Sequence, residues 1–223
     1  MNEHDDQIIL INKPLKWTSF DVVKKVRNSI KVKKVGHAGT LDPMATGLLI
    51  LCTGKLTKQI SNYQNLEKEY TGNMIIGKNR PSHDLETDVV ETNDISSITE
   101  QQVKDIISNY RGEIEQIPPM HSAIKINGKR LYLKARKGIE VPVKPRTIQI
   151  KEFQITEIDF PLIHFKVVCS KGTYIRSLVR DVGKDLKVGA YLNSLKRTRI
   201  GDFSLNDALD IESFIKKVNY KEE

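Results

Sequence analysis

One loop of the 223-residue chain carries the side chains best suited to chemistry. Residues 36–47 read GHAGTLDPMATG, which places Asp42 directly before a proline and between glycines. Glycines let a partner approach the backbone closely. Pro43 disfavours helical geometry at Asp42 and so helps to hold its carboxylate in an extended pose. Spacing alone leaves two interpretations open, because Asp-Pro is also common in ordinary turns.

A second candidate segment, residues 169–178, reads CSKGTYIRSL. Gly172 and Thr173 are expected to end a strand and begin a helix. Tyr174 and Arg176 would then lie in the first helical turn, near the positive end of the helix dipole. Arg176 there could pair with a carboxylate or a phosphate, or it could be a surface residue beside a half-buried tyrosine.

Two further segments are weaker when each is taken alone. Residues 68–70, KEY, place Tyr70 at the start of an expected strand, where an aromatic side chain is more often part of the core. Residues 116–123, QIPPMHSA, lead directly into the most basic part of the chain.

Positive charge is concentrated in that part of the chain. The formal net charge is +8, from 36 Lys and Arg against 28 Asp and Glu. Nine bases and one acid lie between residues 121 and 151, which leaves 27 bases and 27 acids elsewhere. Clustered bases bind polyanions by releasing counterions from phosphates. The segment is therefore either a nucleic-acid-binding element or a solvated surface arm.

Composition excludes several other classes of protein. Cys52 and Cys169 are too few for a disulfide framework or a zinc site, and both lie in apolar runs typical of buried thiols. The longest apolar run, residues 48–52, is too short to span a bilayer, and the polar N-terminus is not a secretory signal. There is no Walker loop or Rossmann fingerprint, and the five histidines are too scattered for a metal pair. The sequence predicts a cytosolic protein without a metal.

Short strands and helices must position these residues. Periodicity predicts strands at residues 7–11, 48–52, 67–76, 148–158 and 163–168. It predicts helices that Thr18 or Ser19 and Thr99 cap, ending near residues 30 and 109, and further helices at 130–137 and 174–186. Residues 35–47 are expected to form a loop, and residues 191–199 carry a mixed strand or turn pattern. Because regular βαβ alternation is missing, an α+β fold with a largely antiparallel sheet is favoured.

Together these segments resemble the bacterial tRNA pseudouridine synthase B (TruB) family. The resemblance covers nearly the whole chain, from INKP at residues 11–14 to KRT at residues 196–198, and GHAGTLDPMATGLL and CSKGTYIRSL are its most specific parts. It implies a mixed, largely antiparallel sheet of the pseudouridine synthase type, with flanking helices and a protruding basic arm at about residues 119–146. It also implies a catalytic domain at residues 1–205 and a short C-terminal helix or tail at residues 206–223, with no RNA-binding PUA domain.

The function implied by the resemblance is that of an isomerase. Family members convert the T-loop uridine at tRNA position 55 to pseudouridine, which requires the nucleotide to be flipped into a pocket. The reaction needs no cofactor. The resemblance therefore implies tRNA, through its T-arm, as the partner, no obligate protein partner, no membrane association and a cytoplasmic location.

Residue roles follow by motif position. Asp42 matches the catalytic aspartate, which could act as a nucleophile or as a base. Arg176 matches the arginine that pairs with it and keeps it ionised, and Tyr70 matches the aromatic that stacks on the flipped base. The remaining matches are residues that line the uracil pocket (Tyr174, Leu195), contact the RNA (His37), lie near the site as bases (Lys13, Lys58) or grip the RNA from the arm (Lys125, Lys129, Arg130, Lys134, Arg136).

Two departures from the family pattern lie outside this catalytic set. His121 stands where the family usually has Tyr, and residues 82–86, SHDLE, replace a TDT-type segment. Both are expected to affect substrate fit more than reaction type. Two alternatives remain: a non-catalytic tRNA-binding protein or RNA chaperone, and a guide-dependent catalytic subunit like that of box H/ACA particles, which needs a PUA domain.

Overall fold

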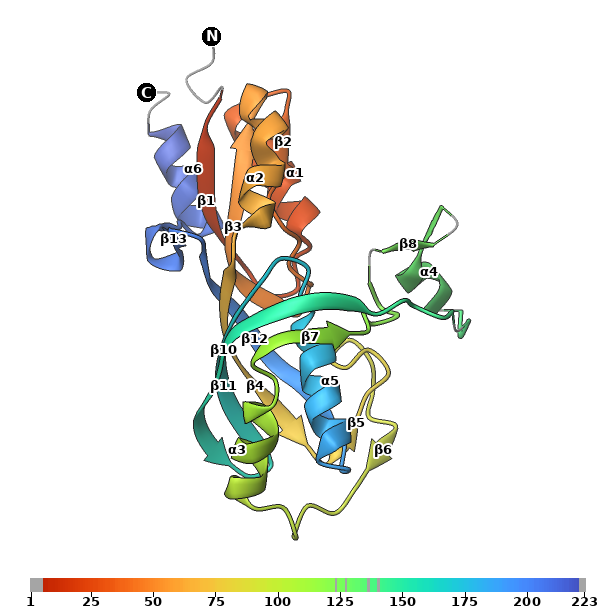
Figure 1. Cartoon of the computed structure of the whole chain (residues 1–223). Coiled ribbons are helices and arrows are strands. Elements are labelled where there is room, and N and C mark those ends of the chain that lie inside the picture. The colour runs from red at the N-terminus through yellow and green to blue at the C-terminus, as the bar shows by residue number, and fades with distance from the viewer. Residues whose placement is uncertain (1–5, 123, 127, 136, 140, 221–223) are drawn as a thin grey trace. The chain divides into compact units, whose positions relative to one another are not determined.

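The structure is a computed structural model that describes residues 6–122, 124–126, 128–135, 137–139 and 141–220 (Figure 1). The chain divides into two compact units. The first comprises residues Met1–Thr71 and Leu195–Glu223, and the second comprises Gly72–Ser194. Two strands, β4 (Lys68–Ile76) and β12 (Ala190–Ile200), each begin in one unit and end in the other.

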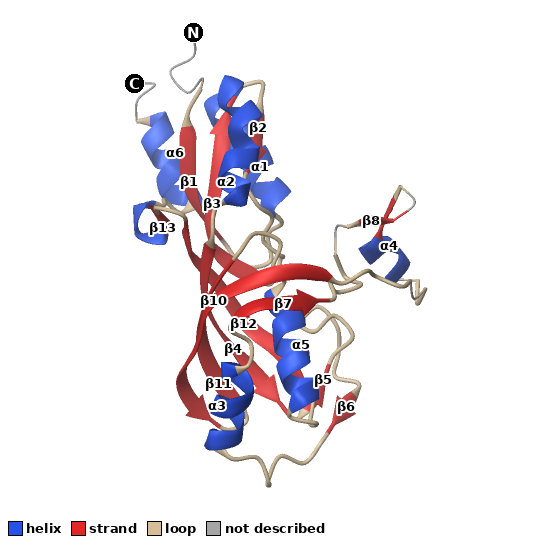
Figure 2. Cartoon of the chain, viewed as in Figure 1, coloured by secondary structure: helices blue, strands red, loops and turns tan. Residues whose placement is uncertain are grey.

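The sheet of the first unit has the order β1–β3–β12–β4 (Figure 2). Strand β1 (Ile8–Lys13) pairs antiparallel with β3 (Ala45–Thr53), and β12 pairs parallel with the other side of β3. Two short strands complete the edges: β2 (Val35–His37) pairs with β3, and β13 (Phe203–Ser204) pairs with β12. The catalytic candidate Asp42 lies in the connection between β2 and β3.

Both faces of β3 are buried, which explains its continuous apolar sequence. Leu49 and Leu51 pack with α1 (Ser19–Ile30) and α6 (Ile211–Asn219) on one face. The other face carries Leu48, Ile50 and Cys52, which pack against η1 (Gly54–Gln59) and α2 (Ile60–Asn65). Each fully buried leucine contributes about 1.5–3 kcal/mol relative to an exposed one. β3 is therefore a rigid support for the loop that precedes it.

Helix α1 is capped by Thr18, one of the two predicted cap residues, in a capping box. The Thr18 hydroxyl accepts a hydrogen bond from the Asp21 amide at 3.1 Å, and the Asp21 carboxylate accepts one from the Thr18 amide at 2.8 Å. Such caps stabilise a helix by about 1 kcal/mol. The cap fixes the start of α1, and with it the position of Ser19.

In the second unit the sheet has the order β12–β4–β11–β10–β7. Strands β10 (Arg146–Asp159) and β11 (Leu162–Cys169) form a long antiparallel hairpin, and β7 (Gly112–Gln116) pairs antiparallel with the first part of β10. Helices α3 (Glu100–Ser108) and α5 (Ile175–Asp185) belong to this unit, as does the small β5 (Lys78–Asn79) and β6 (Glu91–Thr92) pair. Phe153 and Phe165 meet edge to face in its core, with ring centroids 5.7 Å apart.

The basic arm joins β7 to β10 in the second unit. It contains a hairpin of β8 (Lys125–Ile126) and β9 (Lys129–Arg130), followed by the short helix α4 (Leu131–Ala135). Backbone hydrogen bonds from the Tyr132 amide to the Ser122 carbonyl and from the Leu131 amide to the Ile124 carbonyl join the start of α4 to the segment before β8. Arg136 and the side chains of Lys125 and Lys129 lie outside the described part of the structure.

The α+β prediction is confirmed, because strands and helices are mixed and the sheet joins one parallel pair, β3 with β12, to antiparallel neighbours. Residues 35–47, predicted to be a loop, also contain β2 and the start of β3. Residues 191–199 form a regular strand. The tail helix α6 packs into the core of the first unit. No helix in the described residues is long and apolar enough to cross a membrane.

Candidate active site

The loop that carries Asp42 (residues 38–44, the Asp42 loop) is held at several points within the first unit. Ser19 fixes its centre, because its hydroxyl accepts a hydrogen bond from the Leu41 amide at 2.9 Å and donates one to the Leu41 carbonyl at 3.2 Å. The Lys16 amide donates to the Pro43 carbonyl at 2.8 Å. The loop therefore has a defined backbone path on both sides of Asp42.

A buried arginine from β12 holds the same loop from another direction. Arg197 is 1% exposed, and its guanidinium donates to the carbonyls of Leu48 at 2.8 Å, Gly39 at 3.1 Å and Thr40 at 3.4 Å. A planar guanidinium can satisfy several carbonyls at once, which a lysine cannot do with the same geometry. Arg197 therefore ties the Asp42 loop to the start of β3.

Gly47, which is paired in the sheet with two buried cationic residues, lets β12 approach the start of β3 closely. In the sheet it is paired with Lys13 on β1 and with Arg197 on β12. Gly47 has φ +106°, and a Cβ atom there would lie 2.3 Å from the Arg197 carbonyl oxygen. A side chain would thus force β12 away. The glycine noted in the sequence motif is a requirement of strand packing.

Lys13 is the second of these buried cations. Its ammonium donates to the carbonyls of Pro14 at 2.9 Å and Trp17 at 2.6 Å. Burial lowers the pKa of Lys13 to about 8, and the negative charge of Asp42 partly opposes that change. Lys13 is therefore mostly protonated at pH 7, about one pH unit below its pKa, and its charge interacts with that of Asp42.

The first unit also contains four other residues matched to the family site. His37 ends β2; burial, assisted by Arg197, lowers its pKa, so it is neutral at pH 7. Its Nδ1 is buried and finds no hydrogen-bond partner in the described structure. Tyr70 on β4 and Leu195 on β12 are each 8% exposed and lie on neighbouring strands. Lys58 is exposed on η1, after β3.

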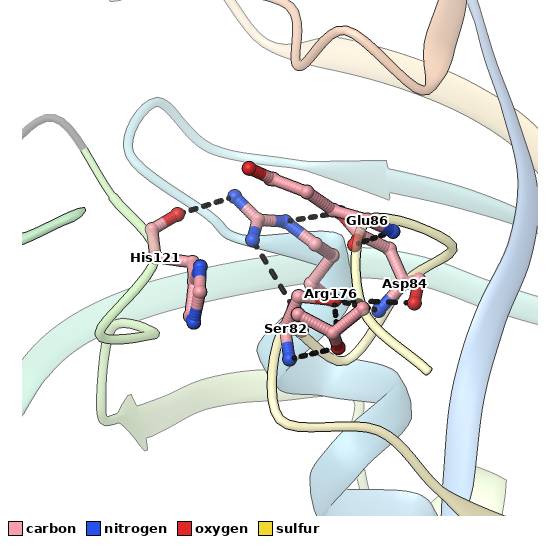
Figure 3. A network of polar contacts seen from close by, with 6 residues as sticks. Ser82, Asp84, Glu86, His121 and Arg176 are labelled. Atoms are coloured by element: carbon pink, nitrogen blue, oxygen red, sulfur yellow. Dashed lines mark hydrogen bonds and ion pairs between the residues drawn. The ribbon is translucent and has the colours of Figure 1, made fainter. Parts of the chain in front are cut away.

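Arg176 lies in the second unit, at the start of α5 (Figure 3), and its side chain is buried, at 3% exposure. Its Nε forms an ion pair with Asp84 at 3.4 Å, also a buried residue. Its other nitrogens donate to the Ser82 carbonyl at 3.2 Å and the His121 carbonyl at 2.9 Å. Asp84 in turn accepts a hydrogen bond from the Glu86 amide at 2.9 Å. The guanidinium plane is thus fixed from three directions.

The expectation that the two departures from the family pattern avoid the catalytic set is wrong. Ser82, Asp84 and His121 all contact Arg176 directly (Figure 3). The physical reason is that Arg176 is long and buried, so it reaches segments about 55 and 94 residues away in sequence. Two of the contacts use backbone carbonyls, which any residue supplies, so the changed side chains at positions 82 and 121 leave them available.

Tyr174 caps α5 in the second unit, and it is held by Gln116 and Arg146. The predicted pairing of Asp42 with Arg176 joins residues of different units and stays a prediction, as do the assigned roles of Tyr70, Tyr174 and Leu195. Within each unit the structure does group the candidates: Asp42 with Lys13 in the first, and Arg176 with Tyr174 on α5 in the second. The described arm residues Arg130 and Lys134 belong to the second unit.

Sequence reasoning missed three residues that support the site: Arg197, Asp84 and Gln116. Each is almost fully buried, at 1%, 3% and 1% exposure. Buried charged and amide side chains are rare unless they are paired, but burial cannot be read from a single sequence. No local signal marks Arg197, which lies in the polar run KRTR at residues 196–199.

Comparisons with known proteins agree with this architecture. A family model described as TruB family pseudouridylate synthase (N terminal domain) matches residues 27–175. A tRNA pseudouridine synthase B of Phocaeicola vulgatus is 49% identical over 220 residues, covering 96% of this chain and 94% of that protein. One of Flavobacterium johnsoniae is also 49% identical, over 217 residues, covering 94% and 95% of the two chains.

Solved structures show the same fold. A crystal structure of a Cbf5-Nop10-Gar1 complex contains a chain with a TM-score of 0.77 and 27% identity; the match covers 97% of this chain and 55% of that one. The archaeal box H/ACA Nop10-Cbf5 complex gives a TM-score of 0.74 at 24% identity, covering 99% and 56%. This chain therefore spans little more than half of those chains.

A mixed sheet with a braced aspartate loop and a buried arginine at the start of α5 accordingly belongs to a pseudouridine synthase. The matched family model covers most of the chain, and the curated relatives match it over nearly their full length. The chain belongs to the TruB family.

Proposed function

We propose that the protein is a stand-alone tRNA pseudouridine synthase that isomerises the T-loop uridine at tRNA position 55. The observation that carries the proposal is the Asp42 loop: a carboxylate on a backbone fixed by Ser19 and Arg197, beside the buried ammonium of Lys13. Relatives at 49% identity that match nearly the whole chain bear the name tRNA pseudouridine synthase B. We place the activity in the cytoplasm, where tRNA is processed.

The chemistry is an isomerisation that conserves every atom. The bond between uracil N1 and the ribose C1′ breaks, the base turns, C5 bonds to C1′, and the proton on C5 is lost while N1 gains one. Asp42 could attack as a nucleophile or remove a sugar proton as a base, and both routes start from its ionised carboxylate. The fixed loop would hold that carboxylate in place for either step.

The remaining matched residues then act on the flipped nucleotide. Extruding a base from a folded RNA loop has to be compensated by contacts in the pocket. Tyr70 would stack on the uracil, a contact typically worth about 1–3 kcal/mol, and Tyr174 and Leu195 would line the pocket around it. Arg176 would form an ion pair with Asp42. The bases of the arm would hold the phosphates of the T-arm.

The test is to incubate the protein with an unmodified tRNA transcript and to map pseudouridine by chemical probing. Pseudouridine is expected at position 55 and nowhere in a control transcript that carries cytidine there. Asp42→Asn, which keeps the size of the side chain, should remove the activity but leave tRNA binding within about threefold. Pseudouridine formation by Asp42→Asn at the wild-type rate would refute the proposed role.

The same assay separates the two alternatives. A non-catalytic RNA chaperone would bind the transcript and leave it unmodified. The likeness to H/ACA complexes suggests the second alternative, a guide-dependent subunit. Such a subunit would modify the transcript only when a guide RNA and its proteins are added. Modification by the purified chain alone is the outcome expected here.

A further inference from the structure

The basic arm lies between strands β7 and β10 in the sequence. Gln116 and Arg146, which are paired where the two strands meet the arm, both contact Tyr174. The chain enters the arm from β7 and leaves it into β10, and Gln116 at the end of β7 is paired with Arg146 at the start of β10. All three residues belong to the second unit.

Gln116 holds the backbone of Tyr174. It is 1% exposed; its Nε2 donates to the Tyr174 carbonyl at 3.0 Å, and its Oε1 accepts from the Tyr174 amide at 2.8 Å. Tyr174 is the N-cap residue of α5, and no side-chain hydrogen bond caps that helix end. The amide of Gln116 is thus matched to one residue, as a donor and as an acceptor.

Arg146 holds the side chain of the same tyrosine. Its guanidinium carbon lies 4.6 Å from the centroid of the Tyr174 ring, which is a cation–π distance. The guanidinium also donates a hydrogen bond to the Gly172 carbonyl, two residues before Tyr174. Arg146 therefore makes contacts within the protein, although it belongs to the basic stretch of the sequence that was predicted to bind RNA.

We propose that Gln116 and Arg146 are positioning residues that set the ring of Tyr174 for the target base and couple it to the basic arm. The inference rests on the proposed function, in which Tyr174 lines the uracil pocket. Because Arg146 is the last residue of the arm and lies over the ring, a change in the arm when it grips RNA is transmitted to the ring. Arg146 accordingly serves the catalytic step more than it serves RNA affinity.

The test compares Arg146→Ala with Lys144→Ala. Lys144 is an exposed base two residues earlier in the arm, so the two variants lose the same charge. The measurements are the single-turnover rate of pseudouridine formation at saturating tRNA and the dissociation constant for tRNA at several salt concentrations. Arg146→Ala should lower the rate at least tenfold with affinity within about threefold. Lys144→Ala should weaken tRNA binding, mainly at low salt, and should lower the rate far less than Arg146→Ala does.

Three further variants keep the inference falsifiable if Arg146→Ala folds poorly. Arg146→Lys, which retains the charge, should recover part of the rate. Gln116→Glu, which places an acceptor against the Tyr174 carbonyl, should lower the rate while the arm remains intact. In a Tyr174→Leu background, Arg146→Ala should cost no more than about twofold, because the ring through which it acts is gone.

The inference is overturned if Arg146→Ala and Arg146→Lys both keep the wild-type rate, or if Arg146→Ala reduces the rate equally in the Tyr174→Leu background. Failure of the proposed function would look different, because the wild-type protein itself would then leave the tRNA transcript unmodified.

Discussion

Arg197 provides the sharpest test of how the Asp42 loop is held, because it can be replaced by another cation. In Arg197→Lys the positive charge stays near the start of β3, but the three-way contact of the guanidinium with Leu48, Gly39 and Thr40 is lost. The ammonium of a lysine cannot hydrogen-bond to all three carbonyls that the planar guanidinium of an arginine reaches. The variant thus separates the geometry of Arg197 from its charge.

The expected cost follows from the contacts that disappear. Hydrogen bonds to a charged group contribute about 1.5–3 kcal/mol each, so losing two of them should lower the free energy of unfolding by about 3 kcal/mol. The loop would then be free to shift, and a displacement of about 1 Å at a reacting group costs roughly 100-fold in rate. We expect kcat to fall about 100-fold while the dissociation constant for tRNA stays within threefold.

The assay is urea unfolding together with single-turnover pseudouridine formation, and Arg199→Lys is the matched control. Arg199 lies two residues further along β12, but its pair with Glu67 is partly exposed, and such pairs contribute less than about 1 kcal/mol. Ser19→Ala, which releases Leu41, provides a second and milder perturbation of the loop. The reasoning is refuted if Arg197→Lys is destabilised yet keeps its wild-type kcat, or if both arginine variants behave alike.

Three other predictions use different contacts. Burial lowers the pKa of Lys13 to about 8, whereas a lysine in the unfolded chain has a pKa near 10.4, so above pH 8 the unfolded chain binds more protons than the folded one. The free energy of unfolding should therefore rise with pH, by about 2 kcal/mol relative to Lys13→Met between pH 7 and pH 10, as measured by urea unfolding. A difference between the two proteins that does not change with pH would contradict this. Asp84→Asn removes the carboxylate of the buried Asp84–Arg176 ion pair and should lower the free energy of unfolding by about 3–5 kcal/mol, against less than about 1 kcal/mol for Glu67→Gln at the partly exposed pair with Arg199. A triple alanine variant of the arm, at Lys129, Arg130 and Arg136, should weaken tRNA binding and flatten its salt dependence, with little change in the rate on bound tRNA. A control that loses the same charge on or just after α1, at Lys24, Lys25 and Lys33, should change neither the affinity nor its salt dependence. Equal salt slopes for the two variants would mean that the arm has no special role.

Local patterns predicted most of the fold. Thr18 or Ser19, and Thr99, were recognisable as helix caps because each precedes a run of helix-forming or periodic apolar residues; the structure selects Thr18 over Ser19 and shows a capping box at both Thr18 and Thr99. The apolar run at residues 48–52 was recognisable as a buried strand. Its true start at Ala45 was not, because Gly47 reads as a breaker; the left-handed glycine is tolerated in β3 because Lys13 and Arg197 pair with it from both sides.

The candidate site divides in the same way. Asp42 and Arg176 could be named because each lies in a long and specific motif, whereas Tyr70 could be named only by its position within the family resemblance. Arg197 could not, because KRTR in a strand reads as an exposed polar edge. What buries Arg197 is a set of carbonyls about 150 residues earlier in the chain. Such non-local contacts depend on the folded sheet, which a linear pattern does not contain.

Backbone carbonyls explain how the site can keep its geometry while nearby side chains change. Both buried arginines, Arg197 in the first unit and Arg176 in the second, donate mainly to carbonyl oxygens. A carbonyl is present whatever the side chain, so these contacts constrain the path of the Asp42 loop and of the segments at Ser82 and His121 rather than their composition. Asp84 differs from Ser82 and His121, because it contacts Arg176 through its side-chain carboxylate. Of these three positions, the identity of Asp84 should therefore matter most, and those of Ser82 and His121 remain free to adapt to the RNA.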